Sequence, residues 1–342
     1  MSEALIYDLQ EGQKRQFIDA ETVFLAQRQA RDSALAEVRG SMFWRDLRGV
    51  RTLIRASARG AQKSLGPESP QTLTMYESFV ARKAKLQGRH KALSSQLLVQ
   101  TRLNRALRVG RVPNIVVQVL KALDAHGLHD NFMVVGTHAM FAYEAAAGVR
   151  IGEAAVATRD VDLLFDTRKN VAFFTALSRI DSSLIGIFRK VDPSFEVVSD
   201  QLQTARNQDG FEIDVIRRVA SDADPHPLRM RRFEDDFWAC QIPSGESLLS
   251  ARKFEQTVVS TSGDMALMRT VHPIDFARIK TALASHRDRE PLKRAKDLLQ
   301  AKIALQIVDA YLPHLRETAG APASEGEVQG QGMMCSGLIS DA

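Results

Sequence analysis

The chain has 342 residues, 44% hydrophobic and 25% charged, which is the balance of an ordinary soluble globular protein of two or three domains. Its two cysteines, Cys240 and Cys335, match neither a zinc-site spacing nor a secreted disulfide framework. No apolar run is long enough to cross a bilayer, and the N-terminus lacks the apolar segment of a signal peptide. We therefore expect a cytoplasmic protein with no membrane partner.

Positive charge is concentrated between Arg51 and Arg111. Thirteen lysines or arginines and two acids in that stretch give +11, whereas the whole chain carries +5, so the remainder sums to −6. Such a basic region is typical of a surface that binds nucleic acid or another polyanion. The alternative is a solvated helical face.

Residues 1–111 are predicted to form a helical basic N-terminal region. Apolar and charged residues recur at helical spacing from Glu21 to Val50. Breaks at Gly66-Pro67 and Ser69-Pro70 divide the region into at least two helices or hairpins. Two basic stripes are each predicted to line one helix face. The stripes are Arg51, Arg55, Arg59 and Lys63, and then Arg102, Arg105, Arg108 and Arg111.

Beyond Pro113, helical patterns alternate with short strand patterns, which predicts an α/β fold. The predicted helices are 113–125, 137–147, 170–180, 273–283 and 291–312. The predicted strands are 132–135, 158–165 and 211–216, followed by a hairpin of 254–260 and 265–271. We divide this part of the chain into a catalytic core, a hairpin with C-terminal helices, and a disordered tail rich in Gly, Ala and Ser. These regions are 112–235, 236–316 and 317–342.

Three short motifs carry candidate chemistry, and none is convincing alone. Gly136-Thr137 stands at a strand-to-helix junction, where glycine allows a ligand to approach and the threonine hydroxyl can cap the helix or meet a phosphate. Asp160 and Asp162 are two residues apart on a strand and therefore share a face, where a cation would relieve their repulsion. Asp214 lies on the polar face of a later strand, where a third carboxylate can complete a metal site and accept a proton. Structural caps and solvated edge strands are the alternatives.

In this order the three motifs resemble the site of the DNA polymerase β-like nucleotidyltransferase superfamily. That pattern has a Gly-Ser turn opening a helix, an Asp-x-Asp on the next strand and an aspartate on a later strand. Thr137 replaces the commoner serine and keeps the hydroxyl. The resemblance implies a nucleotidyltransferase fold with a short mixed sheet, flanked by helical regions, and an intact metal site of Asp160, Asp162 and Asp214.

A wider resemblance covers roughly residues 113–312. The segments GTHAMFAYE, TRDVDLLFD, FEIDVIR, LLSARKF and HPIDFARIKTALASHRDREPLKRAKDLLQA are similar to a bacterial family of stand-alone nucleotidyltransferase-fold proteins, distantly related to abortive-infection toxins. In the toxin-like relatives, a lysine and a later basic-acidic pair help hold the triphosphate. Lys280 matches the lysine, or is a surface lysine on an amphipathic helix, and Lys296-Asp297 matches the pair. Arg159 can reach a phosphate or pair with a neighbouring acid.

The predicted function is transfer of a nucleoside monophosphate from an NTP, ATP among them, to an acceptor hydroxyl with release of pyrophosphate. Mg²⁺ is the expected cofactor, with Mn²⁺ as the alternative. The basic residues 51–111 favour RNA, for example a tRNA end, as the acceptor; a protein hydroxyl or a small molecule is the alternative. The rival function is a non-catalytic nucleic-acid-binding or antitoxin-type module with the same fold.

Overall fold

The computed structural model describes residues 5–58, 60–180, 183–221, 224, 226–230 and 236–316. They form two compact units: unit 2 is Glu11–Val109, and unit 1 contains residues 5–10 together with the described residues from Gly110 onward. The regions predicted as catalytic core and C-terminal helices both lie in unit 1. The predicted tail, 317–342, lies outside the described residues.

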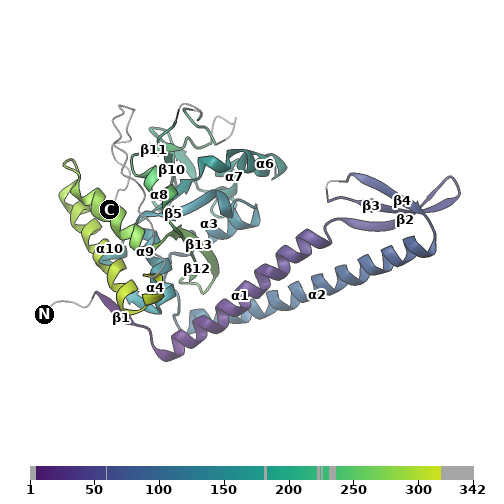
Figure 1. The fold of residues 1–342 in the computed structure, drawn as a ribbon, viewed down its shortest axis with the longest axis horizontal. Coiled ribbons are helices and arrows are strands. Elements are labelled where there is room, and N and C mark those ends of the chain that lie inside the picture. The colour runs from purple at the N-terminus through teal and green to yellow at the C-terminus, as the bar shows by residue number, and fades with distance from the viewer. Residues whose placement is uncertain are drawn as a thin grey trace. The chain divides into compact units, whose positions relative to one another are not determined.

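Unit 2 is built on two long helices that lie side by side (Figure 1). The helices are α1 (Glu11–Glu37) and α2 (Pro70–Ala106), and the three strands between them in the sequence are β2 (Ser41–Leu47), β3 (Val50–Ala56) and β4 (Gln62–Pro67). The strands form an antiparallel sheet in the order β2-β3-β4. Along α2, less exposed side chains recur every three or four residues, the spacing of a coiled-coil seam. The series runs through residues 76, 79, 83, 86, 90, 93, 97, 100 and 104.

Polar side chains fix how the two helices of unit 2 pair. Gln16 Nε2 donates to Asn104 Oδ1 at 3.1 Å and to Gln100 Oε1 at 2.7 Å. Further along, Gln27 Nε2 lies 3.0 Å from His90 Nε2. Earlier residues of α1 thus contact later residues of α2, so the helices are antiparallel. Because a shifted pairing would bury these amides without partners, they specify the register.

The first basic stripe lies on strands, so the helical prediction for residues 1–111 is wrong over β2, β3 and β4. Arg51 and Arg55 belong to β3, and Lys63 on β4 pairs with Arg55. The error has a simple cause: a four-residue spacing keeps side chains on one face of a helix and, being even, on one face of a strand as well. Arg59 lies outside the described residues.

The second basic stripe is interrupted in the structure. Arg102 and Arg105 lie on α2, which ends at Ala106. Arg108 then adopts a left-handed backbone, with φ of 52°, and Arg111 belongs to unit 1. The prediction of one helix face bearing all four arginines is therefore wrong.

Unit 1 contains a mixed sheet in the order β5-β7-β10-β9-β8, with β11 also paired to β10. Its strands are β5 (Phe132–Val135), β7 (Asp160–Phe165), β8 (Glu196–Val198), β9 (Gln201–Arg206), β10 (Glu212–Arg218) and β11 (Cys240–Ile242). The β7-β10 and β10-β11 pairs are parallel, while β5-β7, β9-β10 and β8-β9 are antiparallel. Every residue of β5 and β7 is buried, which explains their nearly continuous apolar sequences.

Helices and two small β pairs complete unit 1 (Figure 1). The helices are α3 (Asn114–Ala125), α4 (Met140–Ala147), α5 (Glu153–Val156), α6 (Asn170–Ile180), α7 (Leu184–Arg189), α8 (Gly245–Ser250), α9 (Pro273–Ser285) and α10 (Pro291–Ala310). Short 3₁₀ turns occupy His129–Asn131, Gly136–Ala139, Thr167–Lys169 and Pro313–Leu315. The β pairs are β12 (Lys253–Val259) with β13 (Met265–Val271), and β1 (Ile6–Asp8) with β6 (Val149–Ile151).

A buried glutamate of α4 ties together the part of unit 1 that precedes the sheet strand β7. Glu144 is 4% exposed and accepts from Arg111 Nη2 at 2.5 Å and from Arg150 Nη1 at 3.0 Å. It also accepts from the backbone N–H of Ile151 at 2.9 Å. Because a buried carboxylate is costly unless paired, these bonds hold α4 against β6.

The predicted α/β fold with a short mixed sheet is confirmed. From residue 113 onward the predicted helices, strands and hairpin agree with the observed elements to within a few residues. The sequence reasoning missed the shorter elements: β1, β6, α5, α7, β8, β9, α8 and β11. Within the described part of the chain, no helix has both the length and the apolarity that a membrane span requires.

Candidate active site

Three aspartates meet on one face of the unit 1 sheet. Asp160 and Asp162 lie two residues apart on β7, and Asp214 on β10 stands opposite Asp162 in the parallel register. One carboxylate oxygen from each lies within 4.8 Å of the others. All three residues are almost fully buried, with 3–4% exposure. The sheet therefore delivers the cluster that the sequence predicted.

Hydroxyl groups and burial set the electrostatics of the three carboxylates. Thr204 on β9 donates to Asp214 Oδ1 at 2.5 Å, and Thr158 donates to Asp160 Oδ1. Burial raises the pKa of Asp214 from its ordinary 3.8 to about 7; the Thr204 bond opposes the rise, and the charge of Asp160 adds to it. Carboxylates crowded in this way repel one another, and a divalent cation that prefers hard oxygen ligands relieves that repulsion. The donor set fits such an ion.

Gly136 lies directly against the carboxylate cluster. It follows β5 and adopts a left-handed backbone with φ of 67°. A Cβ built at this position would collide with Oδ2 of Asp162. Both the backbone conformation and the close approach thus require glycine here. The predicted strand-to-helix junction is confirmed, and its function includes making room for Asp162.

Thr137 is buried beside Gly136 and is held by a side chain from α10. Gln300 Nε2 donates to Thr137 Oγ1 at 3.1 Å and to the carbonyl of Ala155 at 2.7 Å. Gln300 is fully buried. A hydroxyl has one proton to donate, so accepting from Gln300 orients Thr137 to donate elsewhere. The bond also connects α10 to the junction that carries Gly136.

Lys280 lies in a buried ion cluster between α9 and α10. Its Nζ donates to Asp297 Oδ1 at 2.8 Å, and Lys280 is only 4% exposed. Arg289 Nη2 lies 2.7 Å from the other carboxylate oxygen of Asp297. Two cations share one carboxylate, so the cluster retains one positive charge. The structure brings Lys280 together with Asp297, the acidic member of the predicted Lys296-Asp297 pair. Lys280 is buried in the protein and is not a surface lysine.

The other two predicted phosphate ligands flank the carboxylate-bearing strand. Lys296 Nζ donates to the carbonyl of Ala157 at 2.8 Å, three residues before Asp160. Arg159 immediately precedes Asp160 and is exposed. Thus Lys296 and Arg159 both lie close to the start of β7.

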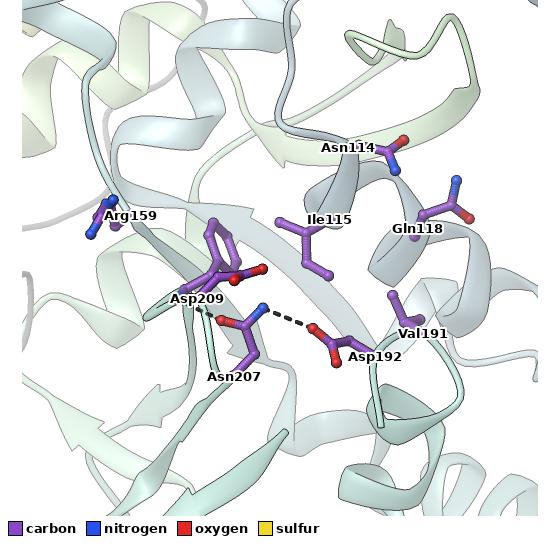
Figure 2. A pocket seen from close by; sticks show the side chains of 9 residues that line it. Asn114, Ile115, Gln118, Arg159, Val191, Asp192, Asn207 and Asp209 are labelled. Atoms are coloured by element: carbon purple, nitrogen blue, oxygen red, sulfur yellow. Dashed lines mark hydrogen bonds between the residues drawn. The ribbon is translucent and has the colours of Figure 1, made fainter. Parts of the chain in front are cut away.

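A cavity of about 420 Å³ lies beside the starts of β7 and β10. Figure 2 shows Arg159 at one edge of it, and Asn207 and Asp192 elsewhere on its wall, joined by a 2.9 Å hydrogen bond. Ile115 and Phe211 supply apolar surface. Its volume is in the range of small-molecule sites. The carboxylate-bearing strands therefore have a ligand-sized space next to them.

A nucleotidyltransferase family model matches residues 114–323, which is more than half of the chain. The chain belongs to this nucleotidyltransferase family. The match spans every strand of the mixed sheet and both C-terminal helices, so it contains the three aspartates and Lys280. No curated protein and no solved structure matches the chain significantly.

Sequence reasoning missed several side chains that shape the site. Gln300 carried a usable signal, because it follows Asp297 by three residues on α10 and therefore shares its face. Thr204 carried none, since only the β9-β10 register places it opposite Asp214. Arg289 lies in the connection between α9 and α10, where helical periodicity gives no information.

Proposed function

We propose that the protein transfers a nucleoside monophosphate from an NTP to an acceptor hydroxyl and releases pyrophosphate. The observation that supports this most is the buried cluster of Asp160, Asp162 and Asp214 within a nucleotidyltransferase family match. Three carboxylates on adjacent parallel strands suit divalent cations, and Mg²⁺ is the ion we assign, with Mn²⁺ as a substitute.

Asp160 and Asp162 would hold the metal ions, with Asp214 completing the site. Bound Mg²⁺ supplies positive charge that neutralises the triphosphate and the charge developing on the leaving pyrophosphate. Asp214, whose pKa burial raises to about 7, would accept the proton of the acceptor hydroxyl. The acceptor oxygen forms a bond to the α-phosphorus as the bond from that phosphorus to the β-phosphate oxygen breaks, and the leaving pyrophosphate takes the electron pair.

Residues around the cluster are assigned to the triphosphate. The backbone at Gly136 would approach the triphosphate closely, and Thr137, oriented by Gln300, has a hydroxyl proton available for a phosphate oxygen. Lys280 contributes through its cluster with Asp297, whose net charge is positive. Lys296 and Arg159, at the start of β7, are the further cations that we assign to the nucleotide.

RNA is the acceptor that we favour, for example a tRNA end. The supporting feature is the charge of unit 2, which contains nineteen lysines or arginines and eight acids and therefore has a net charge of +11. A polyphosphate chain is the natural partner of such a surface. A protein hydroxyl, a small molecule, or binding without turnover are the competing possibilities, and one experiment separates them. The distant resemblance to abortive-infection toxins stays a prediction.

The purified protein should be incubated with each α-³²P-labelled NTP, Mg²⁺, and either total RNA or cell lysate. We expect label on RNA. Label on protein or on a small molecule would show that RNA is not the acceptor. The absence of label from every fraction would contradict the transferase function.

Asp162→Asn is the decisive variant, because it removes one ligand charge without changing side-chain size. We expect at least about a 100-fold loss of transfer, since metal-site geometry controls the reaction. Asp200→Asn is the matched control: it makes the same change at an exposed turn of the same sheet and should retain activity. Full activity in Asp162→Asn would refute the assignment of the cluster.

A further inference from the structure

The small sheet of unit 2 packs one face against α2 and leaves the other facing away from it. Trp44 of β2 lies against Tyr76 of α2, with 5.8 Å between ring centroids. Because side chains alternate along a strand, Phe43 and Arg45 lie on the opposite face from Trp44. There, the Arg45 guanidinium lies 5.3 Å from the centre of the Phe43 ring. The outer face therefore carries an aromatic ring and a cation together.

The turn between β2 and β3 places an arginine where its backbone is disfavoured. Arg48 and Gly49 form the two-residue turn, with φ of 54° and 81°. Two positive φ angles match a type I′ turn, in which Asn-Gly is strongly preferred and arginine is uncommon. The turn joins the pair Leu47 and Val50, which are 42% and 49% exposed. An unfavourable residue at an exposed tip suggests that its side chain serves binding.

Charge around this hairpin is strongly one-sided. Residues 39–68 contain seven lysines or arginines and two acids. Glu68 is paired with Arg51 at 2.8 Å. Within the described part of the chain, no carboxylate forms an ion pair with Arg45 or Arg48, and Arg45 donates instead to the neutral amide of Gln62 at 2.8 Å. Both guanidinium groups are exposed, and their charge is available to an external anion.

We propose that the β2-β3 hairpin (Ser41–Ala56) binds single-stranded RNA, which rests on the proposed transfer to an RNA acceptor. Arg45 and Arg48 contact phosphates, and Phe43 offers a ring on which a base stacks. An acidic protein would satisfy the charges equally. However, an unpaired base can stack on the aromatic ring beside Arg45 and contact the apolar residues at the tip. Each nucleotide of a single strand carries both such a base and a phosphate, so single-stranded RNA matches the ring and the cations together.

The test is binding of the full chain to a short fluorescein-labelled single-stranded RNA, with a chelator and without NTP, so that transfer does not contribute. The variant Arg45→Gln/Arg48→Gln is compared with Arg102→Gln/Arg105→Gln, which removes the same charge from α2. This control pair lies far along α2 from the end of the helix that follows the small sheet. Arg102 is 32 residues beyond Pro70, the first residue of α2, or about 48 Å along the helix at 1.5 Å per residue.

The hairpin variant should bind at least about tenfold more weakly, and its salt slope should fall by about 1.4, at about 0.7 for each lost phosphate contact. The α2 variant should stay within about twofold of the wild type, because it lowers only the general charge. Equal weakening of the two variants, or no weakening of the hairpin variant, would overturn the proposal.

Arg48→Asn separates loss of a contact from loss of folding, since asparagine suits the left-handed turn better than arginine. We expect this variant to unfold at a higher temperature than the wild type and to bind the RNA several-fold more weakly. Unchanged binding would show that Arg48 does not contact RNA and overturn that assignment.

A labelled single-stranded DNA of the same sequence provides the last arm. Because the proposed contacts are to phosphates and bases, which DNA also has, it should bind with similar affinity, and failure of the DNA to bind would contradict those contacts. Failure of any of these binding arms is distinguishable from failure of the proposed function, because transfer is scored separately by the labelled NTPs.

Discussion

Replacing Gly136 with alanine tests the carboxylate cluster without removing any carboxylate. The new Cβ would occupy the space of Asp162 Oδ2, so the carboxylate must turn away from its present position. The backbone must also keep its φ of 67°, a conformation that disfavours alanine. The substitution therefore displaces one metal ligand and strains the chain at the same point.

The two effects have different sizes. A left-handed backbone costs a non-glycine residue about 1–2 kcal/mol, and a carboxylate forced off its rotamer costs about 1 kcal/mol more. The free energy of unfolding should thus fall by about 2–3 kcal/mol, which a stable unit tolerates. Displacing a catalytic group by about 1 Å costs roughly 100-fold in rate, so transfer should fall far more than stability does.

Gly210→Ala is the matched control. Gly210 has φ of 75°, and the nearest neighbour of an added Cβ would be Arg159 Nη1 at 4.0 Å, which is ordinary contact. In urea with a chelator present, Gly210→Ala should lose about 1–2 kcal/mol for its left-handed backbone, and Gly136→Ala about 1 kcal/mol more. Only Gly136→Ala should bind Mn²⁺ about 10- to 100-fold more weakly in a calorimetric titration. Equal Mn²⁺ affinity in the two variants would refute the role of Gly136 in placing Asp162.

Two further substitutions test the supports of the site. Gln300→Leu should lower the free energy of unfolding by about 1–3 kcal/mol and raise KM for the NTP, because Thr137 loses its buried donor. Gln201→Leu, at an exposed position, should change neither quantity. An unchanged KM in Gln300→Leu would show that Thr137 does not take part in nucleotide binding. Glu144→Gln should lower the free energy of unfolding by about 3 kcal/mol in urea, because it leaves two partly buried arginines without their carboxylate. The same change at the exposed Glu196 should have no measurable effect, and comparable losses in both variants would contradict that account.

The sequence predicted those features of the fold that are local. Amphipathic spacing is enough to predict α3 and α6, and a run of apolar residues is enough to predict β5. In each case the apolar residues that the element buries lie within its own sequence. Alternation likewise placed Asp160 and Asp162 on one face. The position of Asp214 beside Asp162 was different: it depends on the parallel pairing of β7 with β10, which no spacing encodes. Only the family resemblance supplied it.

The helical prediction failed where one spacing suits two structures, and other contacts could not be predicted because a partner is distant in sequence. The arginines of β3 are four residues apart, which fits a helix and a strand equally well. Lys280 lies on an amphipathic helix, and its burial depends on Asp297 and Arg289, which come from beyond the end of that helix. Periodicity describes one element at a time and cannot specify such contacts.

The division of charge between the units bears on how a polyanionic acceptor would be held. Unit 2 carries +11, whereas residues 110–316, which contain the three clustered aspartates, have 27 lysines or arginines and 27 acids and sum to zero. That part of the chain therefore offers RNA no net attraction, and the clustered carboxylates repel phosphates except where divalent cations offset their charge. If the acceptor is RNA, as we propose, unit 2 would supply most of its electrostatic affinity. Salt should accordingly weaken the binding of RNA more steeply than the binding of the NTP, because two of the residues assigned to the NTP, Thr137 and Lys280, are buried and therefore less screened.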